Sequence, residues 1–485
     1  MVRSTLVFLR FQPNPVVSNF LGGVGLDSQK INAISPLDGR YAGQLDDLSS
    51  IVSEGALIGY RLRVEAIWLL HLASFKDIGL SFLSGVQTFL QAIAVGTIPV
   101  QAASEVKHIE KDTNHDVKAV EYWLRRRLTD VGADNKTLSH IHFACTSEDI
   151  NNAAYGLMLK DLRSKILIPV LSDLQAQLSL LAECEASTAM LSRTHGQTAT
   201  PTTLGKEIAV FTYRLGRQVK SLINQPILGK FNGAVGNYNA HHAAYPNLDW
   251  VAVSKSFIEG RLQLAWNPLT TQIESHDSFV EYMQTIHLIN SILIGFSRDM
   301  WGYISLGYFA QKALEGEVGS STMPHKVNPI YFENAEGNLG LANSILRHFA
   351  EKLPISRWQR DLSDSTVLRT TGTGIGHSVL AYASLASGLK RVAVNPSVIR
   401  KDLSDAWEVL AEPVQTMMRR YGVVDAYEKL KTATRGSGVI TRDMIHVAID
   451  SCAEIPGDVR TIMKAWTPSN YIGLAPRLAT EFAKK

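Results

Sequence analysis

Residues 319–329 read GSSTMPHKVNP, and their types suit acid–base chemistry or anion binding on a loop. Ser320 and Ser321 offer hydroxyls, Lys326 a positive charge, and Asn328 an amide that both donates and accepts hydrogen bonds. The phosphate-loop pattern G-x-x-x-x-G-K-[ST] and the hydrolase pattern G-x-S-x-G are both absent from the sequence. A plain surface turn explains the composition equally well, and spacing does not distinguish the two serines.

A second polar interruption, LSRTHGQTATP at 191–201, places His195 beside a glycine between two helical runs. A histidine among arginine, threonine and glutamine side chains titrates near neutral pH and can act as an acid or a base. A solvated loop histidine is the competing interpretation, and it fits the segment equally well.

A third segment, TNHDVKAVEY at 113–122, opens a helix with Asn114, His115 and Asp116. The free N–H groups of a helix start favour an anion. Simple capping by Asn114 or Asp116 explains those two residues but leaves His115 unexplained.

Two further segments combine hydroxyls with charges. In HFACTSEDINN, at 142–152, Thr146 and Ser147 precede two acids, and capping of a helix start is the stronger explanation there. In SRWQRDLSDSTVLR, at 356–369, guanidinium groups lie among hydroxyls, a combination that suits phosphate, although a solvated helix face is the commoner outcome. The residues concerned are Arg357, Arg360, Arg369, Ser363, Ser365 and Thr366.

The elements that must position these segments are helical almost throughout. Apolar residues recur at three- and four-residue steps over 117–128, 161–192, 202–224, 277–312 and 371–393. Alternating runs that would indicate a sizeable sheet are absent. Residues 277–312 are apolar nearly all round, which predicts a helix at the centre of a bundle and oligomerisation by helix association. The uncharged stretch 78–104 reads as an amphipathic helix rather than a membrane span.

Composition narrows the function classes. The 485 residues include 48 basic and 45 acidic side chains, so nothing points to nucleic acid or an acidic membrane. Three isolated cysteines indicate a reducing compartment, which we take as the cytoplasm, and no disulfide framework. The sequence has neither metal-ligand spacing nor a nucleotide-cofactor glycine motif, so we expect no metal and no cofactor.

The pattern predicts four parts along the chain. Residues 1–26 carry two arginines, serines and no acid, which fits an organellar targeting segment and a disordered tail equally well. The other three parts are an N-terminal helical domain at 27–135, a central long-helix bundle at 136–393 and a C-terminal helical domain at 394–485.

GSSTMPHKVNP resembles the mobile loop of the fumarase/aspartase superfamily, whose pattern is G-S-S-x-M-P-x-K-x-N-P. Within that superfamily, several segments resemble the adenylosuccinate lyase family, and the resemblance runs from about residue 30 to 475. These segments are SPLDGRY at 35–41, TNHDVKAVEY, HFACTSEDINN, LSRTHGQ, GAVGNYNAH at 233–241 and WEVLAEPVQTMMRRYG at 407–422.

The resemblance implies a mainly α, three-domain fold whose long central helices are pooled in a homotetramer, with each active site built from three subunits. It implies β-elimination of fumarate from adenylosuccinate, giving AMP, and from the succinylated carboxamide ribotide of purine biosynthesis. Partners would therefore be these small molecules and three further copies of the chain, without nucleic acid or membrane.

The resemblance also assigns roles. Ser320 is implied as the catalytic base, His195 as the general acid, and Glu333 as a supporting residue. The implied substrate-binding residues are Arg40, Tyr41, Asn114, His115, Asp116, Thr146, Ser147, Gln272, Ser321, Lys326, Asn328, Asn334, Arg360, Ser365, Thr366, Val367, Leu368 and Arg369.

The chain departs from the family pattern at Thr198, Ser275 and Tyr331, where proline, proline and aspartate are expected. None is a proposed catalytic group, so we expect effects on packing or rate. Two alternatives remain open at this point: another fumarate-releasing lyase of the superfamily, and a catalytically silent structural homologue. Intact Ser320, His195 and Lys326 favour an active enzyme over the latter.

Overall fold

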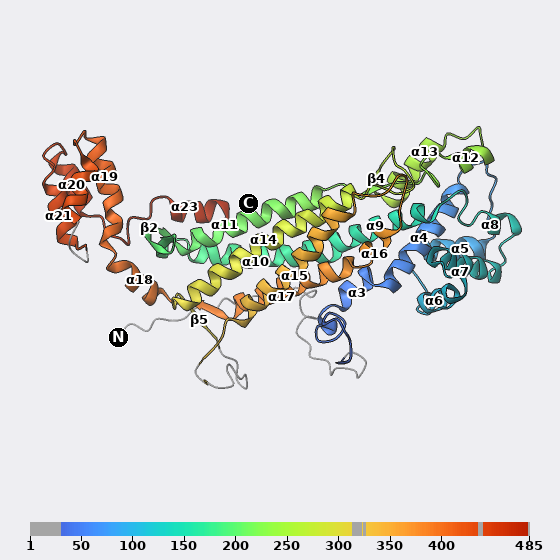
Figure 1. Cartoon of the computed structure of the whole chain (residues 1–485), viewed down its shortest axis with the longest axis horizontal. Helices are drawn as coiled ribbons and strands as arrows, with labels where there is room; N and C mark the ends of the chain where they lie inside the picture. Colours follow the sequence, from blue (N-terminus) through green and yellow to red (C-terminus); the bar gives the residue numbers. More distant parts are fainter. Residues whose placement is uncertain (1–30, 313–322, 324–325, 435–439, 484–485) are drawn as a thin grey trace.

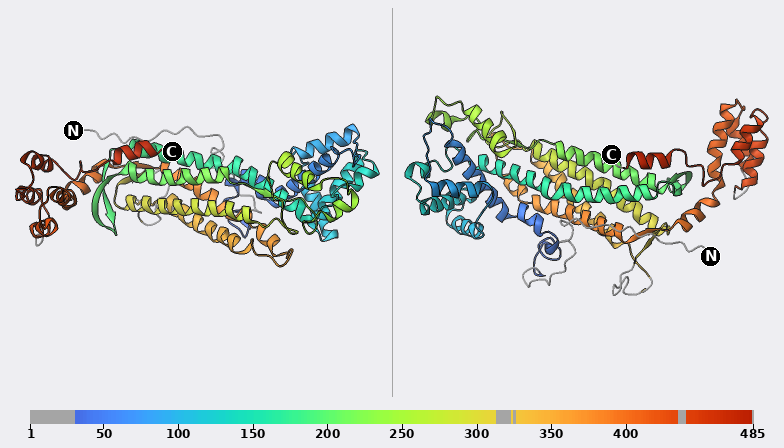
Figure 2. Two further views of the ribbon diagram at one scale, coloured as in Figure 1. Left: turned by 90° about the horizontal axis from the view of Figure 1, so that it is seen from above. Right: turned by 180° about the vertical axis from the view of Figure 1, so that it is seen from behind.

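A computed structural model describes residues 31–312, 323, 326–434 and 440–483. The molecule is elongated, with a bundle of long helices in the middle (Figure 1). The first helices of the chain lie at one end of this bundle, and a small group of late helices lies at the other end (Figures 1 and 2). The mainly helical fold predicted from the sequence is confirmed.

The N-terminal end is made of short helices packed around a long one. The long helix, α4, carries twelve buried side chains and packs against α5, α6, α7 and α9. The elements here are η2 (Ala42–Gln44), α3 (Asp46–Val52), α4 (Glu54–Leu72), α5 (Ser84–Ala94), α6 (Ala102–Thr113), α7 (Asp116–Asp130) and α8 (Asn135–Ser139). The helix expected over 78–104 is thus only α5, because Gly96 at φ +94° ends it and α6 starts soon after.

Long helices that run side by side form the bundle. They are α9 (Ser147–Leu162), η3 (Arg163–Leu167), α10 (Ile168–Cys184), α11 (Leu204–Asn224), α14 (Asp277–Ser305), α15 (Ile330–Lys352) and α17 (Thr371–Lys390). The tightest pairings join α15 to both α14 and α17, and α10 to α11. The predicted helices at 202–224 and 371–393 are confirmed to within three residues at either end.

The elements α9, η3 and α10 form one continuous helix of 38 residues, Ser147–Cys184. The π turn η3 lies just before Pro169, which lacks an N–H and whose ring would crowd the carbonyl four residues earlier. A widened turn relieves that conflict without ending the helix. By length and composition this helix could cross a membrane, but half of its most apolar window is buried inside the molecule, as in the core helix of a bundle.

Strands are short and occur in pairs in the described part of the chain. The predicted helix at 161–192 is wrong at its end, because β1 (Ala189–Thr194) pairs antiparallel with β2 (Gln197–Thr203) as a hairpin. The other pairs join β3 (Leu228–Gly229) to β4 (Ala265–Trp266) and β5 (Phe309–Gln311) to β6 (Val392–Val394). Between β3 and α14 lie α12 (Asn239–Ala244), α13 (Trp250–Lys255) and η4 (Ser256–Leu262).

The C-terminal helices have a hydrophobic core of their own, separate from the core shared by the N-terminal end and the bundle. They are α18 (Pro396–Ser404), η5 (Trp407–Leu410), α19 (Ala411–Arg420), α20 (Ala426–Thr434), α21 (Arg442–Asp450) and α22 (Gly457–Lys464). The last helix, α23 (Ala475–Phe482), returns to pack on α11 in the bundle (Figure 1).

Helix α14, predicted to be apolar nearly all round, buries one face within the chain. Its buried positions recur at helical spacing, as Tyr282, Ile286, Ile289 and Leu293 do, whereas Leu288 and Trp301 remain 45% and 49% exposed. Two large apolar side chains of this helix are therefore left exposed by its own chain, among polar ones such as Glu281, Arg298 and Asp299.

Two buried histidines predict how stability depends on pH. Burial lowers the pKa of His71 and of His241 to about 4 each, and neither ring nitrogen of His241 has a hydrogen-bond partner. In the unfolded chain these histidines have pKa values of about 6.5, so below that pH they bind protons that they do not bind in the folded chain. The free energy of unfolding should therefore fall as pH drops from about 6.5 towards 4.

The test compares urea unfolding at pH 7.5 and 5.5 in the wild type and in His241→Gln. The variant should lose about 1 kcal/mol less stability between the two values, because one of the two groups is gone. His142 works in the opposite direction, since Glu65 raises its pKa despite burial, and it is unchanged in the comparison. Equal losses in the two proteins would contradict the assignment.

Candidate functional site

Charged side chains join into one hydrogen-bonded chain at the N-terminal end of the bundle, beginning at Arg369. Its Nη1 donates to Glu54 Oε2 and its Nη2 to Asp116 Oδ2, at 2.7 and 2.8 Å. Asp116 Oδ2 also accepts from Arg61 Nη2 at 2.8 Å. One carboxylate therefore holds two guanidinium groups, from α4 and from the end of α16 (Ser363–Leu368).

The chain of contacts continues from Arg61 into the first turn of α9. Arg61 Nε donates to Asn151 Oδ1 at 2.9 Å, and Asn151 Nδ2 donates to Glu148 Oε1 at 2.7 Å. Glu148, with its side chain only 3% exposed, also holds Arg360 Nη2 at 3.0 Å. The two arginines singled out in the sequence, Arg360 and Arg369, are thus linked through residues of α4, α7 and α9.

Arg360 extends the network to the segment before α14. Its Nη1 donates to Gln272 Oε1 at 3.3 Å and its Nη2 to Ser365 Oγ at 3.2 Å. Asp364 lies 3.7 Å from Arg360 and 3.4 Å from His276 Nε2. The predicted residues Gln272, Arg360 and Ser365 are therefore in contact, although Gln272 lies far from the other two in the sequence.

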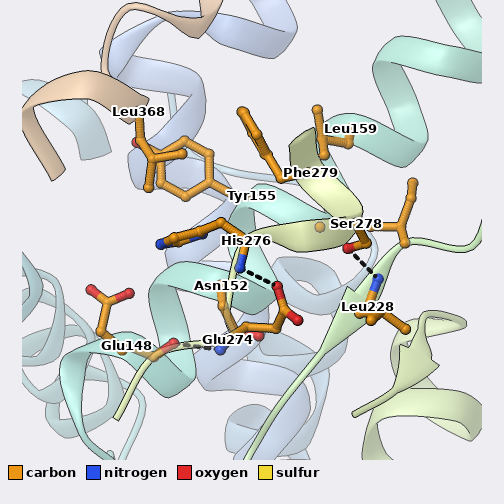
Figure 3. A pocket seen from close by; sticks show the side chains of 12 residues that line it. Glu148, Asn152, Tyr155, Leu159, Leu228, Glu274, His276, Ser278, Phe279 and Leu368 are labelled. Carbon is orange, nitrogen blue, oxygen red and sulfur yellow. Dashed lines mark hydrogen bonds between the residues drawn. The ribbon is translucent and has the colours of Figure 1, made fainter. Parts of the chain in front are cut away.

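A small cavity of about 20 Å³ lies behind this network, between α9 and the start of α14 (Figure 3). Glu148, Tyr155, Glu274, His276 and Leu368 are among the residues that line it. The His276 N–H donates to Glu274 at 3.0 Å, which fixes the backbone before α14. Leu368, expected to contact substrate, is 4% exposed, so its side chain supports the network from the core side.

Two carboxylates of the network, those of Asp116 and Asp364, are held in their ionised form. Burial opposes ionisation of Asp116, but attraction to Arg61 and Arg369 and the hydrogen bond from Val117 hold its pKa below the usual value. Burial likewise opposes ionisation of Asp364, and the hydrogen bond from His276 with the charge of Arg360 outweighs it. The site therefore balances its positive charges with fixed negative ones.

Capping explains the sequence around two of the predicted segments. The N-cap of α7 is His115, whose Nδ1 accepts from Lys118 N at 3.1 Å, so the expectation that Asn114 or Asp116 caps this helix is wrong. Asn114 instead ends α6 at φ +50°. At α9 the capping interpretation is confirmed, because Thr146 and Asp149 form a capping box in which Asp149 accepts from Thr146 N at 2.8 Å.

Asp149 also anchors the GAVGNYNAH segment through a buried ion pair. Lys230 Nζ lies 2.9 Å from Asp149 Oδ1, and both side chains are 0% exposed. The N–H groups of Asn232 and Gly233 donate to the same carboxylate. This pair fixes the start of α9, which carries Glu148, against the loop before α12.

The remaining N-terminal residues lie before α3. The guanidinium of Arg40 lies 5.8 Å from the centre of the Tyr41 ring, and Arg40 is exposed while Tyr41 packs against the main core. Among the residues that the structure describes, no hydrogen bond or ion pair joins these two residues to Arg360 or Arg369 directly, and Figure 1 places their segment beside the bundle, ahead of α3.

His195 lies at the opposite end of the bundle, at the tip of the β1–β2 hairpin (Figure 1). Thr194 pairs with Gln197, so His195 and Gly196 form a two-residue loop with φ of +53° and +74°. Two positive values define a primed hairpin turn, which usually takes asparagine and glycine. The imidazole is exposed, and the ion pair of Arg193 with Asp402 at 2.5 Å ties the hairpin to α18.

A third group of predicted residues lies at the start of α15. Lys326 is exposed and its N–H donates to Met323 O at 3.0 Å, while Glu333 Oε1 accepts from Trp301 Nε1 at 3.1 Å. Asn334 accepts from Asn338 Nδ2 at 3.2 Å. Ser320 and Ser321 lie outside the described residues, so the structure does not place the predicted base.

The three groups are held apart by rigid helices. A 38-residue helix is about 57 Å long, and Ser147–Cys184 separates Thr146 from the His195 hairpin. The 29-residue α14, about 43 Å long, separates His276 from the strand β5 that leads towards the serine loop. One copy of the chain thus brings Gln272, Arg360, Ser365, Arg369 and Asp116 together but leaves His195 and Lys326 remote from them.

Sequence reasoning missed several members of the network: Glu54, Arg61, Glu148, His276 and Asp364. Arg61 carried a usable signal, because a charged residue inside an apolar helix requires a buried partner. Glu54 and Glu148 lie in first helical turns, where the helix dipole already favours acidic residues. Their pairing with arginines therefore could not be recognised from the sequence.

Comparison with known proteins identifies two family models and related structures and sequences. The family model described as Lyase matches residues 39–342, and the model described as Adenylosuccinate lyase C-terminal matches residues 356–472. A fumarate lyase from Mesorhizobium sp. BNC1 superposes with a TM-score of 0.72 at 16% identity, covering 90% of this chain and 97% of that one. A 3-carboxy-cis,cis-muconate lactonizing enzyme from Pseudomonas putida gives 0.70 at 20% identity, covering 90% and 96%.

The fold and the matched models define a lyase of the fumarase/aspartase type. Adenylosuccinate lyase from Vibrio cholerae is 49% identical over 93% of this chain and 99% of its own length. The Escherichia coli (strain K12) adenylosuccinate lyase is 48% identical over 94% and 100%. The chain belongs to the adenylosuccinate lyase family, and the expected membership is confirmed.

The buried pair Lys230–Asp149 gives a test of how the site is held. Lys230→Met leaves the Asp149 carboxylate buried without its cation, which should lower the free energy of unfolding by about 3–5 kcal/mol. Lys220→Met, at an exposed position of α11, should change it by less than about 0.5 kcal/mol. Urea unfolding measures both, and equal small effects would show that the pair does not anchor the site.

Proposed function

We propose that this chain cleaves adenylosuccinate to AMP and fumarate, and likewise releases fumarate from the succinylated carboxamide ribotide. The observation that carries this proposal is the 49% identity with an adenylosuccinate lyase across nearly the full length of both chains. The class of enzyme, a lyase that breaks a C–N bond, follows from the family. We propose that the enzyme acts in the cytoplasm. A targeting role for residues 1–26 stays a prediction.

The chemistry is a β-elimination. A base removes a proton from the carbon beside a carboxylate, the C–N bond breaks, and an acid protonates the leaving nitrogen. The proton is weakly acidic, so the negative charge that develops on the carboxylate needs strong electrostatic stabilisation. No redox step or group transfer to a carrier is involved, so the residues of the protein suffice for the reaction as written.

Each residue group takes one part of this reaction. Ser320 is the proposed base, with its alkoxide stabilised by nearby charge, and Lys326 and Asn328 would hold the succinyl carboxylates. His195 is the proposed acid. The hairpin that presents its exposed imidazole is fixed by the Arg193–Asp402 ion pair, and Glu333 supports the acid site.

The network around Arg360 and Arg369 is the proposed phosphate and ribose end. Guanidinium groups with Ser365 and Gln272 offer convergent donors to a dianion, and Arg40 and Tyr41 would complete this end. Donors from Asn114, His115, Thr146, Ser147, Ser321, Asn334 and the 365–369 turn, which includes Thr366 and Val367, are proposed to contact the remaining parts of the substrate.

A complete site requires several copies of the chain. The rigid separations of about 57 and 43 Å keep the three groups apart in one copy, and the exposed Leu288 and Trp301 of α14 offer apolar contacts to another. We therefore propose a homotetramer in which the hairpin, the serine loop and the arginine network of three different subunits meet. The symmetry of such an assembly builds the same site four times.

The competing activities share the fold, so the assay must separate them. Purified protein is mixed in turn with adenylosuccinate, argininosuccinate, malate and aspartate, and the ultraviolet spectrum is followed. Production of AMP and fumarate from the first substrate alone is the expected result. Absence of product at generous enzyme concentration would rule out the proposal and favour a silent homologue, and turnover of another substrate would favour a sister lyase.

Variants in two of the groups test the shared site. Ser320→Ala and His195→Ala should each lower kcat by at least about a thousandfold, because each removes a proton-transfer group. Size-exclusion chromatography with light scattering should show an unchanged tetramer for both. Denaturing and refolding the two variants together should then restore part of the activity, because some sites receive both intact residues.

Refolding each variant alone is the control for that mixture and should give no activity. A mixture that stays inactive, although its tetramers form, would contradict a site built from different subunits.

A further inference from the structure

The arginine that the proposed function assigns to phosphate is already occupied in the free chain, and the inference below rests on that assignment. Arg369 donates to two carboxylates at once, Glu54 at 2.7 Å and Asp116 at 2.8 Å. A phosphate that approaches either terminal nitrogen therefore meets a carboxylate already bound there and competes with it, although the guanidinium keeps further N–H groups.

The two carboxylates differ in how firmly they are held. Asp116 is 24% exposed, accepts from Arg61 and from Val117 N, and belongs to the buried chain of contacts. Glu54 is 39% exposed, and its ion pair with Arg369 bridges α4 to the end of α16. Exposed ion pairs are weak, so Glu54 is the one that yields.

Glu54 has a second cation within reach. Lys107 Nζ, on α6, lies 3.5 Å from Glu54 Oε1 and 2.7 Å from Glu110 Oε2. Glu54 is also the first residue of α4, where the free N–H groups of the helix stabilise a negative charge. When Glu54 is released from Arg369 it therefore keeps favourable partners, so its displacement costs little free energy.

A buried donor next to the pair is also unsatisfied. Arg61 is 2% exposed, and its Nη1 has no hydrogen-bond partner among the described residues. Its Nη2 and the Nη2 of Arg369 share Asp116 Oδ2, so the two guanidinium groups lie around one carboxylate. The surroundings of Arg369 thus carry more donors than the free chain uses.

We propose that Glu54 sets the affinity of Arg369 for phosphate-bearing ligands: its carboxylate occupies the Nη1 side of the guanidinium and leaves when a phosphate dianion arrives. A dianion outcompetes a single carboxylate charge for the guanidinium, whereas a neutral ribose does not. Competition lowers the affinity for every phosphate-bearing ligand by the same factor. Product AMP consequently leaves faster than it would from an unopposed arginine.

Glu54→Gln tests this by removing the charge and keeping the shape. Isothermal titration calorimetry on the full-length protein should show Kd values for inorganic phosphate and for AMP that fall about three- to tenfold, while the Kd of adenosine stays unchanged. In steady-state kinetics, KM for adenosine-phosphate substrates should fall and kcat should not rise.

Glu110→Gln is the matched control, since it removes a carboxylate from the same Lys107 without touching Arg369. Its Kd values for phosphate and AMP should stay within about twofold of the wild type. Thermal unfolding of both variants confirms that each is folded.

Unchanged or weaker phosphate and AMP binding in Glu54→Gln would overturn the inference, as would an equal gain in Glu110→Gln. The binding measurement needs no turnover, so its failure is distinct from failure of the proposed function. If the wild-type enzyme cleaves adenylosuccinate but Glu54→Gln binds phosphate no more tightly than the wild type, the proposed function stands and the role proposed for Glu54 is wrong.

Discussion

The length of rigid helix between polar segments governs how this protein can work. Backbone hydrogen bonds make a helix of 38 residues a rod of about 57 Å, and the chain places Thr146 at one end and the His195 hairpin beyond the other. No side chain bridges such a distance. In the proposed assembly the polar segments therefore meet between copies, and the bundle serves both as the scaffold of one subunit and as the means of joining several.

The arginine network shows how a concentrated positive charge is kept stable before substrate binds. Arg61, Arg360 and Arg369 would repel one another if left alone, and burial would raise that cost. Asp116 holds the guanidinium groups of Arg61 and Arg369, and Glu148 holds that of Arg360 together with the Asn151 amide, so positive and negative charges alternate along one connected path. The pairing therefore holds the guanidinium groups in fixed positions before a ligand binds.

Much of this could be predicted from the sequence, for reasons that differ between segments. Helical periodicity was strong in α11 and α17, because their apolar faces pack within the chain, and it failed at 189–192, where four apolar or small residues suit either a helix or a hairpin strand. The pairing of Gln272, Arg360 and Ser365 followed from the family resemblance, whereas Glu54 and Glu148 were hidden because acids in a first turn need no further explanation. His115 was recognised as anomalous, yet its actual role as a cap lay outside the residue types usually expected there.

The π turn before Pro169 has a consequence for how this chain can change over evolutionary time. A single residue added to a helix rotates everything beyond it by about 100° and advances it by about 1.5 Å. Within Ser147–Cys184 such an insertion would change the direction in which the hairpin projects from the bundle, unless a widened turn absorbed the extra residue. Substitutions along this helix are therefore tolerated wherever the packing allows them, whereas the number of residues on either side of the π turn is constrained. The π turn marks the place in the helix where an inserted residue can be accommodated.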